Sequence, residues 1–347
     1  MSIVTTLFIG DPHVQTSNIT EINLCLEKLI ILAKDKLPTI IVIAGDLLHT
    51  HERLHTTALN KAYELVDEMR KISPTYVLVG NHDMENNQQF LTTNHWMNAM
   101  KDWDNTFIID TVLSTIINDK QFLFVPYVPP GRFEEALNTL EVKWNDASCI
   151  FCHQEFFGCK MGAIISVEGD KWSLDNPHII SGHIHSKQTP QKNIYYSGSM
   201  LQHAFGESSK NIIAYLTFDD NKDYKLDEID LQLPRKKIIY LDIEDIDKYN
   251  TPTTEDKIKI TLTGNYEQFK AVKKTKKYKK LMNDGIKVVF KPKNIDSKND
   301  TKISESTNDF SSILNQLVNN QKNTYLNESY ELVINNKKIN PSDIMYI

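Results

Sequence analysis

The chain has 347 residues, which is room for about two domains at roughly 150 residues per domain. Its apolar fraction of 40% and charged fraction of 24% are ordinary for a folded globular protein, and they exclude global disorder. No apolar run reaches the roughly 18 residues of a membrane span, the N-terminus lacks signal-peptide features, and the four cysteines do not form a disulfide scaffold. We expect a reducing compartment, cytoplasmic or nuclear, no membrane contact and no secretion.

The net charge of −6 is unevenly distributed along the chain. Residues 1–255 carry 22 lysines and arginines against 35 aspartates and glutamates, a net charge of −13. Residues 256–302 carry 14 against 5, a net charge of +9. A basic segment therefore follows an acidic body, and the average charge alone does not exclude a nucleic-acid partner.

Short apolar runs alternate with helical segments between residues 1 and 218. Helices are expected at residues 19–36 and 56–72, where apolar side chains recur with helical spacing. Strands are expected at residues 5–10, 39–45, 75–80, 121–128, 147–153, 178–183 and 193–198. This order predicts an α/β (α+β) core over residues 1–234, with mixed sheets flanked by helices.

A second, smaller unit is expected at residues 235–293. It has strand patterns at residues 236–243, 257–264 and 286–292 and one helix at 266–283, which together predict a compact β-α-β module. Residues 294–309 are polar without periodicity and indicate a flexible linker. In the C-terminal segment 310–347 we expect an amphipathic helix at 311–320 and a terminal strand or hairpin at 331–339.

Almost every predicted strand of the first unit ends in a side chain that can bind a metal. Four of these side chains come directly after a glycine, as expected where the backbone turns sharply. In open α/β sheets, sites form at the carboxyl ends of strands, so these side chains should meet. The candidate ligands are Asp11, His13, Asp46, Asn81, His153, His183 and His185.

Each cluster of candidate ligands can also be explained by a role in folding that needs no metal. A single aspartate at a strand end usually caps a turn, and lone histidines such as His95 or His203 are more often surface or core residues. Residues 149–153 match the C-x-x-C-H haem-attachment pattern, but they lie in an expected buried strand, so we interpret these cysteines as core residues. Capping does not require five such clusters at five strand ends, and we therefore predict a metal site.

The donor types indicate the metal. Imidazoles mixed with carboxylates and an amide oxygen suit Mn²⁺, Fe²⁺ or Zn²⁺ better than Mg²⁺ or Ca²⁺. Seven ligands are too many for one ion and suit two ions that share a carboxylate. We expect two divalent ions, Mn²⁺ first, with Zn²⁺, Fe²⁺ or Mg²⁺ as alternatives. Two ions some 3.5–4 Å apart can activate water and hold a phosphoryl group.

The same residues carry a family resemblance. The segments at 11–13 (DPH), 45–49 (GDLLH), 80–83 (GNHD) and 182–185 (GHIH), together with His153, resemble the ordered motifs of calcineurin-like metallophosphoesterases. Within that superfamily the chain is most similar to the Mre-eleven/SbcD DNA repair nucleases, including phage and large-virus members. GDLLHTHER, YYSGSMLQHAFGE (195–207) and the β-α-β unit after Pro234 carry this narrower resemblance. It implies a four-layer sandwich with a small DNA-capping domain.

The resemblance also implies a role for each site residue. Asp11, His13 and His185 would bind one ion, Asn81, His153 and His183 the other, and Asp46 would bridge them. His82 would assist the leaving oxygen and His49 would face the substrate phosphate, with hydrolysis by a metal-bound hydroxide.

The basic segment has two interpretations. A run of charge is usually a solvated face, but so many lysines on one short helix favour contact with phosphate backbones. The candidate DNA-binding residues are Lys273, Lys274, Lys276, Lys277, Lys279 and Lys280.

The amphipathic helix at 311–320 either packs against its own chain or docks on a partner. Family resemblance implies a coiled-coil ATPase of the SbcC type as that partner. A homodimer is left open.

From the sequence we predict a two-metal DNA nuclease in double-strand-break repair, recombination or replication. The expected activities are exonuclease on duplex ends and endonuclease on single strands. The first alternative is a phosphatase or small-molecule phosphodiesterase of the same fold. The alternative from another class is a non-catalytic binding scaffold, against which the complete ligand set argues.

Overall fold

The computed structural model describes residues 2–51, 54–220, 223–293 and 310–334. The chain forms two compact units, Met1–Lys293 and Asn294–Ile347, and each is described by itself. No helix within the described residues is long and apolar enough to cross a membrane.

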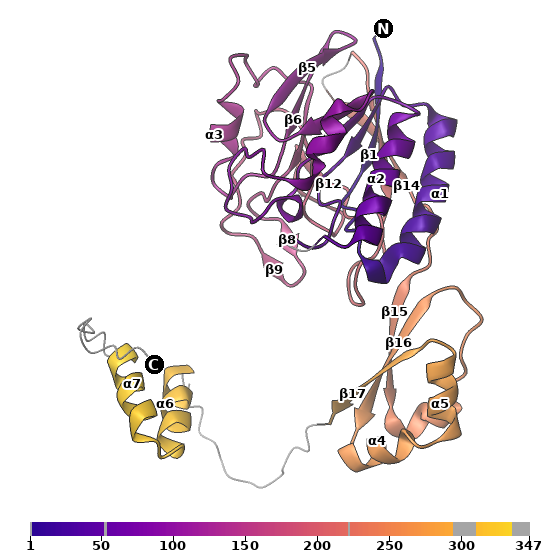
Figure 1. Cartoon of the computed structure of the whole chain (residues 1–347), viewed down its shortest axis with the longest axis vertical. Coiled ribbons are helices and arrows are strands. Elements are labelled where there is room, and N and C mark those ends of the chain that lie inside the picture. Colours follow the sequence, from indigo (N-terminus) through magenta and orange to yellow (C-terminus); the bar gives the residue numbers. More distant parts are fainter. Residues whose placement is uncertain (1, 52–53, 221–222, 294–309, 335–347) are drawn as a thin grey trace. The chain divides into compact units, whose positions relative to one another are not determined.

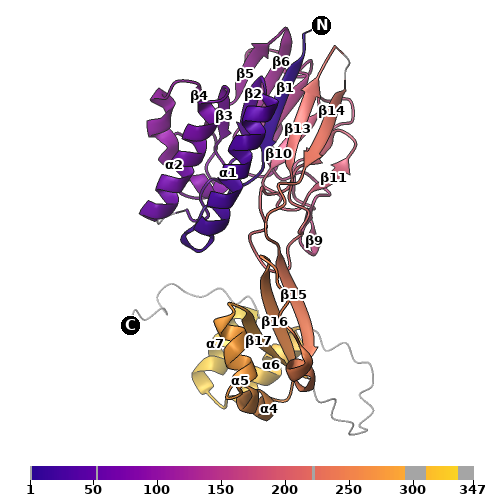
Figure 2. The same ribbon diagram turned by 90° about the vertical axis from the view of Figure 1, so that its right-hand side faces the viewer.

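Two six-stranded sheets form the body of the first unit (Figures 1 and 2). The first sheet has the order β14-β13-β1-β2-β3-β4, in which β1 to β4 are parallel and β13 and β14 are antiparallel additions. Its strands are β1 (Val4–Ile9), β2 (Ile40–Ile43), β3 (Thr75–Leu78), β4 (Thr106–Ile109), β13 (Ile213–Phe218) and β14 (Tyr224–Ile229).

The second sheet has the order β11-β12-β10-β7-β6-β5, with β6, β7, β10 and β12 parallel and the two edge strands antiparallel. Its strands are β5 (Leu113–Ile117), β6 (Lys120–Val125), β7 (Cys149–His153), β10 (Ile179–Gly182), β11 (Gln188–Gln191) and β12 (Ile194–Tyr196). A separate hairpin pairs β8 (Lys160–Met161) with β9 (Ile164–Ile165).

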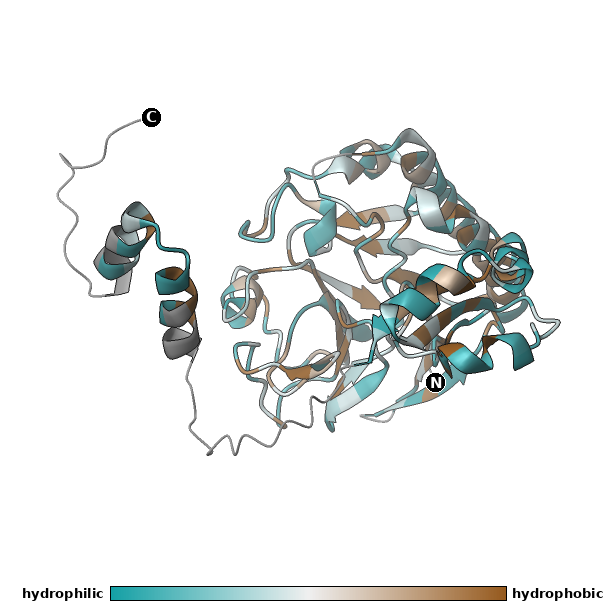
Figure 3. Cartoon of the chain, turned by 90° about the horizontal axis from the view of Figure 1, so that it is seen from below, coloured by the Kyte–Doolittle hydropathy of each residue, from teal (hydrophilic) through white to brown (hydrophobic). Residues whose placement is uncertain are grey.

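Alternating side chains divide the apolar residues among three layers of core. In β1, Leu7 packs under α1 (Ile19–Lys36) and α2 (Thr56–Arg70), while Phe8 points between the two sheets. In β7, Phe151 fills the same central layer and Ile150 faces α3 (Phe133–Leu137). Figure 3 shows brown apolar positions along the strands. The predicted α/β sandwich, with mixed sheets flanked by helices, is confirmed.

The third sheet contains β15 (Lys236–Asp242), β16 (Lys257–Gly264) and β17 (Lys287–Pro292), all parallel. Two short helices, α4 (Tyr266–Val272) and α5 (Lys276–Asn283), follow β16 and bury Phe269 and Leu281 against this sheet.

The single helix predicted at 266–283 is wrong, because Thr275 divides it. The Thr275 hydroxyl accepts the N–H of Tyr278 and donates to the carbonyl of Val272, so it caps α5 and ends the preceding turn.

The second unit contains α6 (Phe310–Asn320), which confirms the predicted amphipathic helix, and α7 (Thr324–Ile334). The strand or hairpin predicted at 331–339 is wrong over residues 331–334, which are helical. Leu326, Tyr330 and Val333 recur at helical spacing, so the apolar run continues a helix. The predicted linker 294–309 and residues 335–339 lie outside the described residues. The proposed boundaries at 234 and 293 stay predictions.

Candidate metal centre

The parallel strands of both sheets deliver the candidate ligands. Asp11 and His13 follow β1, Asp46 follows β2, and His153 is the last residue of β7. Asn81 begins the short 3-10 helix η2 (Asn81–Asp83) after β3, and His183 and His185 follow β10. The structure brings all seven of these residues together.

The backbone is strained where it turns into the site. His13, Asp46 and His183 have φ values of 42°, 50° and 76°, in the left-handed region that residues other than glycine rarely adopt. Such conformations cost about 1–3 kcal/mol each and persist where the surroundings enforce them. Their presence at three candidate ligands indicates that the fold tolerates backbone strain in order to place these side chains in the site.

Two of the preceding glycines let the strands approach the site closely. A Cβ on Gly80 would lie 2.2 Å from Asp46 Oδ1, and a Cβ on Gly182 would lie 2.5 Å from Asp11 Oδ1. A larger residue at either position would displace a buried carboxylate.

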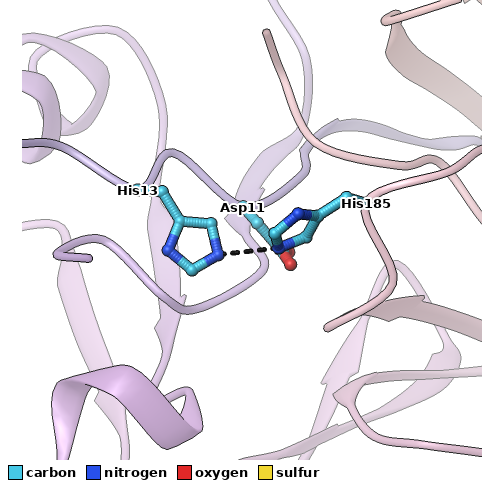
Figure 4. Close-up of side chains that lie close together, drawn as sticks. All are labelled: Asp11, His13 and His185. Carbon is cyan, nitrogen blue, oxygen red and sulfur yellow. Dashed lines mark hydrogen bonds between the residues drawn. The ribbon is translucent and has the colours of Figure 1, made fainter. Parts of the chain in front are cut away.

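The first group consists of Asp11, His13 and His185, whose ligand atoms lie within 4.8 Å of one another (Figure 4). The Nε2 atoms of His13 and His185 face each other at 2.9 Å. Asp11 is fully buried, its Oδ1 accepts the backbone N–H of His183, and its Oδ2 has no hydrogen-bond partner in the described part of the chain. A buried carboxylate oxygen without a donor is costly, and a bound cation fits this position.

The second group consists of Asp46, His153 and His183, again within 4.8 Å. His153 Nδ1 donates to the carbonyl of Ala44 at 2.6 Å, so its Nε2 faces the group. Asn81 Oδ1 lies 3.1 Å from that Nε2 and 2.9 Å from His183 Nδ1. An amide oxygen aimed at two imidazole nitrogens is an arrangement that fits a cation.

Asp46 lies between the two groups. Its Oδ2 is 3.5 Å from His13 Nε2 and 3.4 Å from His153 Nε2, and its Oδ1 accepts the backbone N–H of His82 at 2.8 Å. A carboxylate that reaches both groups is placed as a bridging ligand requires.

The electrostatics of the site follow from burial and close charges. Burial lowers the pKa of His13 and lowers that of His183 to about 3, so both imidazoles stay neutral with lone pairs available. Burial opposes charge on Asp46, yet the adjacent His153 holds the pKa of this carboxyl well below its usual range. Burial raises the pKa of Asp11.

His49 and His82 lie beside the first group and belong to neither group. His82 Nδ1 donates to the carbonyl of His49 at 2.8 Å, and its ring stacks on that of His51 with centroids 4.4 Å apart. The His49 ring centroid lies 5.2 Å from that of His13. Both side chains are therefore available to a ligand at the centre.

Sequence reasoning missed two residues that shape this centre. Asp83 accepts backbone N–H groups of Leu47 and Gly80 and the indole N–H of Trp96, each at 3.1 Å, so it joins the loops after β2 and β3. His203, interpreted as a lone structural histidine, donates to the carbonyl of Asp11 at 3.1 Å. The acidic end of the GNHD segment was a signal for Asp83, and the YYSGSMLQHAFGE segment was a signal for His203.

A cavity of about 840 Å³ borders the centre. Its walls include His183, His185 and Glu207, together with Phe205 and residues 160–163 of the β8–β9 hairpin. Met161, Ala163 and Phe205 contribute apolar side chains to these walls. The cavity thus offers cation-binding groups beside apolar surface.

The predicted DNA-binding lysines lie outside this centre, on or between α4 and α5. Lys277 is half-buried and donates to the carbonyl of Tyr249, while the other five are exposed. The structure does not bring them to the ligands.

Comparisons with known proteins identify the relatives of this chain. Residues 4–187 match the model of the calcineurin-like phosphoesterase family. The chain is 55% identical over 282 residues to "Putative phosphoesterase 244L" of Invertebrate iridescent virus 6, covering 78% of this chain and 97% of that protein. It is 48% identical over 295 residues to "Putative phosphoesterase 078R" of Invertebrate iridescent virus 3, covering 84% and 85%.

Among solved structures, a dimetal phosphatase from Danio rerio is 9% identical with a TM-score of 0.43. The match covers 65% of this chain and 95% of that chain.

Because Asp46 lies between the two groups, we expect its loss to weaken the binding of both ions. The wild-type chain should retain two Mn²⁺ ions after dialysis, and Asp46→Asn should lower affinity at both positions by more than the roughly 10–100-fold cost of an outer-shell change. Metal content is measured by inductively coupled plasma mass spectrometry. The control is Asp110→Asn, which alters a buried carboxylate paired with His95 and Lys101. One ion retained at full affinity by Asp46→Asn would rule out a shared ligand.

Proposed function

Because the chain belongs to the calcineurin-like phosphoesterase family and is a metal-dependent phosphoester hydrolase, we propose that it is a two-metal DNA nuclease. It would act as an exonuclease on duplex ends and an endonuclease on single strands, in double-strand-break repair, recombination or replication. The Mre-eleven/SbcD nucleases are the branch that its motifs resemble.

The observation that favours DNA as the substrate is the exposed lysine surface formed by α5 and the turn that joins α4 to α5. Lys273, Lys274, Lys276, Lys279 and Lys280 are exposed within a span of eight positions. Closely spaced lysines bind phosphates of a polyanion irrespective of sequence, and a small phosphate ester does not need them.

The cavity beside the ligands supports the same substrate. Its metal-binding groups suit a phosphodiester, while Met161, Ala163 and Phe205 suit the flat face of a nucleobase. Polar and apolar walls together fit a nucleotide better than inorganic phosphate.

The two cations, when bound, would supply an activated water and charge neutralisation for displacement at phosphorus. The chain's own residues hold the geometry for it. Asp46 reaches His13 of the first group and His153 of the second. The hydrogen bond to the carbonyl of Ala44 keeps the proton of His153 on Nδ1 and leaves Nε2 free for a cation. Asp83 holds the loops that carry Asp46 and Asn81.

His82 would donate a proton to the leaving oxygen. Its Nδ1–H is engaged by the carbonyl of His49, so Nε2 is the nitrogen that would take up and donate the exchangeable proton. Burial lowers the pKa of His82, and the imidazole of the free protein is mostly neutral at pH 7. An arriving phosphodiester anion favours the protonated form. His49 would face the substrate phosphate.

The proposed partner is a coiled-coil ATPase of the SbcC type, which would dock on α6. The amphipathic pattern of α6 supports a helix that binds in an apolar groove.

The decisive activity test uses a labelled DNA duplex. We expect Mn²⁺-dependent cleavage by the wild type, which chelation abolishes, and no cleavage by Asp46→Ala or His183→Ala because each removes a ligand candidate. Products are resolved on denaturing gels. Hydrolysis of a chromogenic small ester without cleavage of any DNA would favour the phosphatase alternative.

Replacement of His82 should separate chemistry from metal binding. His82→Asn should keep both ions and lower kcat by roughly 10²–10⁴-fold, as loss of a general acid does. The matched control is His55→Asn, since His55 caps α2 and asparagine caps equally well. Loss of metal together with activity would show that His82 is a ligand instead.

Charge reversal tests the lysine surface. Lys276→Glu, Lys279→Glu and Lys280→Glu combined should weaken DNA binding and lower its salt dependence by about one unit of slope per lost phosphate contact, while small-ester hydrolysis is unchanged. Lys34→Glu, Lys143→Glu and Lys192→Glu give the same charge change on exposed positions of the body. Equal DNA affinity in both triple variants, measured by fluorescence anisotropy, would refute the assignment.

A further inference from the structure

A carboxylate lies behind one of the candidate ligands, on the side away from the centre. His185 Nδ1 is 3.4 Å from Glu207 Oε1, while Nε2 of the same ring faces His13 Nε2 at 2.9 Å. We propose that Glu207 is a positioning residue for His185, an inference that rests on the proposed metal role of His185. By accepting the Nδ1 proton, Glu207 fixes the tautomer that leaves the Nε2 lone pair for the cation.

The carboxylate of Glu207 is itself held in one orientation. Its Oε2 accepts the backbone N–H groups of His203 and Ala204, each at 2.9 Å. One oxygen is therefore committed to the backbone of its own loop, and Oε1 is the oxygen that points to His185. A side chain fixed in this way orients the imidazole without ordering a mobile group when the ion binds.

The loop that carries Glu207 is anchored on the third sheet. Gln202 Nε2 donates to the carbonyl of Glu207 at 3.0 Å and to the carbonyl of Lys236 at 3.2 Å. In return, the backbone N–H of Lys236, the first residue of β15, donates to Gln202 Oε1 at 2.7 Å. The position of Glu207 thus depends on the strand that begins the lysine-bearing unit.

This arrangement gives the two ions different support. The first group, Asp11, His13 and His185, has Glu207 behind one ligand, whereas in the second group a backbone carbonyl orients His153. Removal of an outer-shell carboxylate typically costs 10–100-fold in metal affinity. Loss of Glu207 should therefore weaken the binding of one ion and leave the binding of the other nearly unaffected.

Isothermal titration of the metal-free full chain with Mn²⁺ tests this inference. Glu207→Ala should weaken one of the two binding events by roughly 10–100-fold and leave the other within about threefold. Glu207→Gln should weaken the same event, because its one amide oxygen cannot accept both the backbone N–H groups of His203 and Ala204 and the Nδ1 proton of His185. Asp110→Asn, which alters a histidine–carboxylate pair outside both groups, should change neither event.

Three outcomes would overturn the inference. Unchanged binding by Glu207→Ala would show that His185 needs no support. Complete loss of one ion in Glu207→Ala, beyond the roughly 10–100-fold cost of an outer-shell change, would identify Glu207 as a ligand in its own right. Equal weakening of both events, with a lowered thermal midpoint of the metal-free protein, would indicate a general structural role. A wild type that binds two ions and hydrolyses only small esters would refute the DNA proposal and leave this inference intact.

Discussion

Asp46 is a buried carboxylate whose Oδ2 lies 3.5 Å from His13 Nε2 and 3.4 Å from His153 Nε2. His13 follows a strand of the first sheet and His153 ends a strand of the second, so this oxygen lies where the edges of the two sheets meet. A buried carboxylate needs nearby positive charge or several donors to remain ionised. The sandwich meets that need by holding imidazoles from both sheets around Asp46, and two cations would complete the compensation.

The alternation of strands and helices, and the ligands at the strand ends, could be predicted because they depend on local pattern. Parallel strands place their carboxyl ends at one edge whatever the details of packing, so Asp11, Asp46 and Asn81 could be expected to meet. The glycine before the ligand was also visible in the sequence, and at Gly80 and Gly182 the structure shows the close approach that requires it.

What could not be predicted depends on contacts between distant segments. Glu207 and His203 belong to the YYSGSMLQHAFGE segment, but the sequence does not say what they contact, and only the fold places them at His185 and Asp11. Thr275 divides the basic helix because its hydroxyl caps α5. The lysines on both sides of Thr275 are compatible with one continuous helix, so the sequence pattern did not indicate this break. The prediction of a terminal strand was wrong over residues 331–334 because a short apolar run fits both a strand and a helix, and only the longer pattern distinguishes them.

The third sheet is connected to the metal centre through few residues. Glu21 of α1 pairs with Lys236 and Lys257, and Gln202 joins β15 to the loop of Glu207. A surface that binds DNA phosphates and a centre that hydrolyses them would thus share one hydrogen-bonded segment. This gives a physical reason for a lysine-rich module in a chain whose body is acidic.

We propose that two cations share Asp46. Anomalous diffraction at the manganese edge, from crystals of the full chain soaked in Mn²⁺, tests it most directly. We expect two peaks about 3.5–4 Å apart, one beside Asp11, His13 and His185 and the other beside Asn81, His153 and His183, with Asp46 between them. A single peak, or two peaks of which only one contacts Asp46, would contradict it.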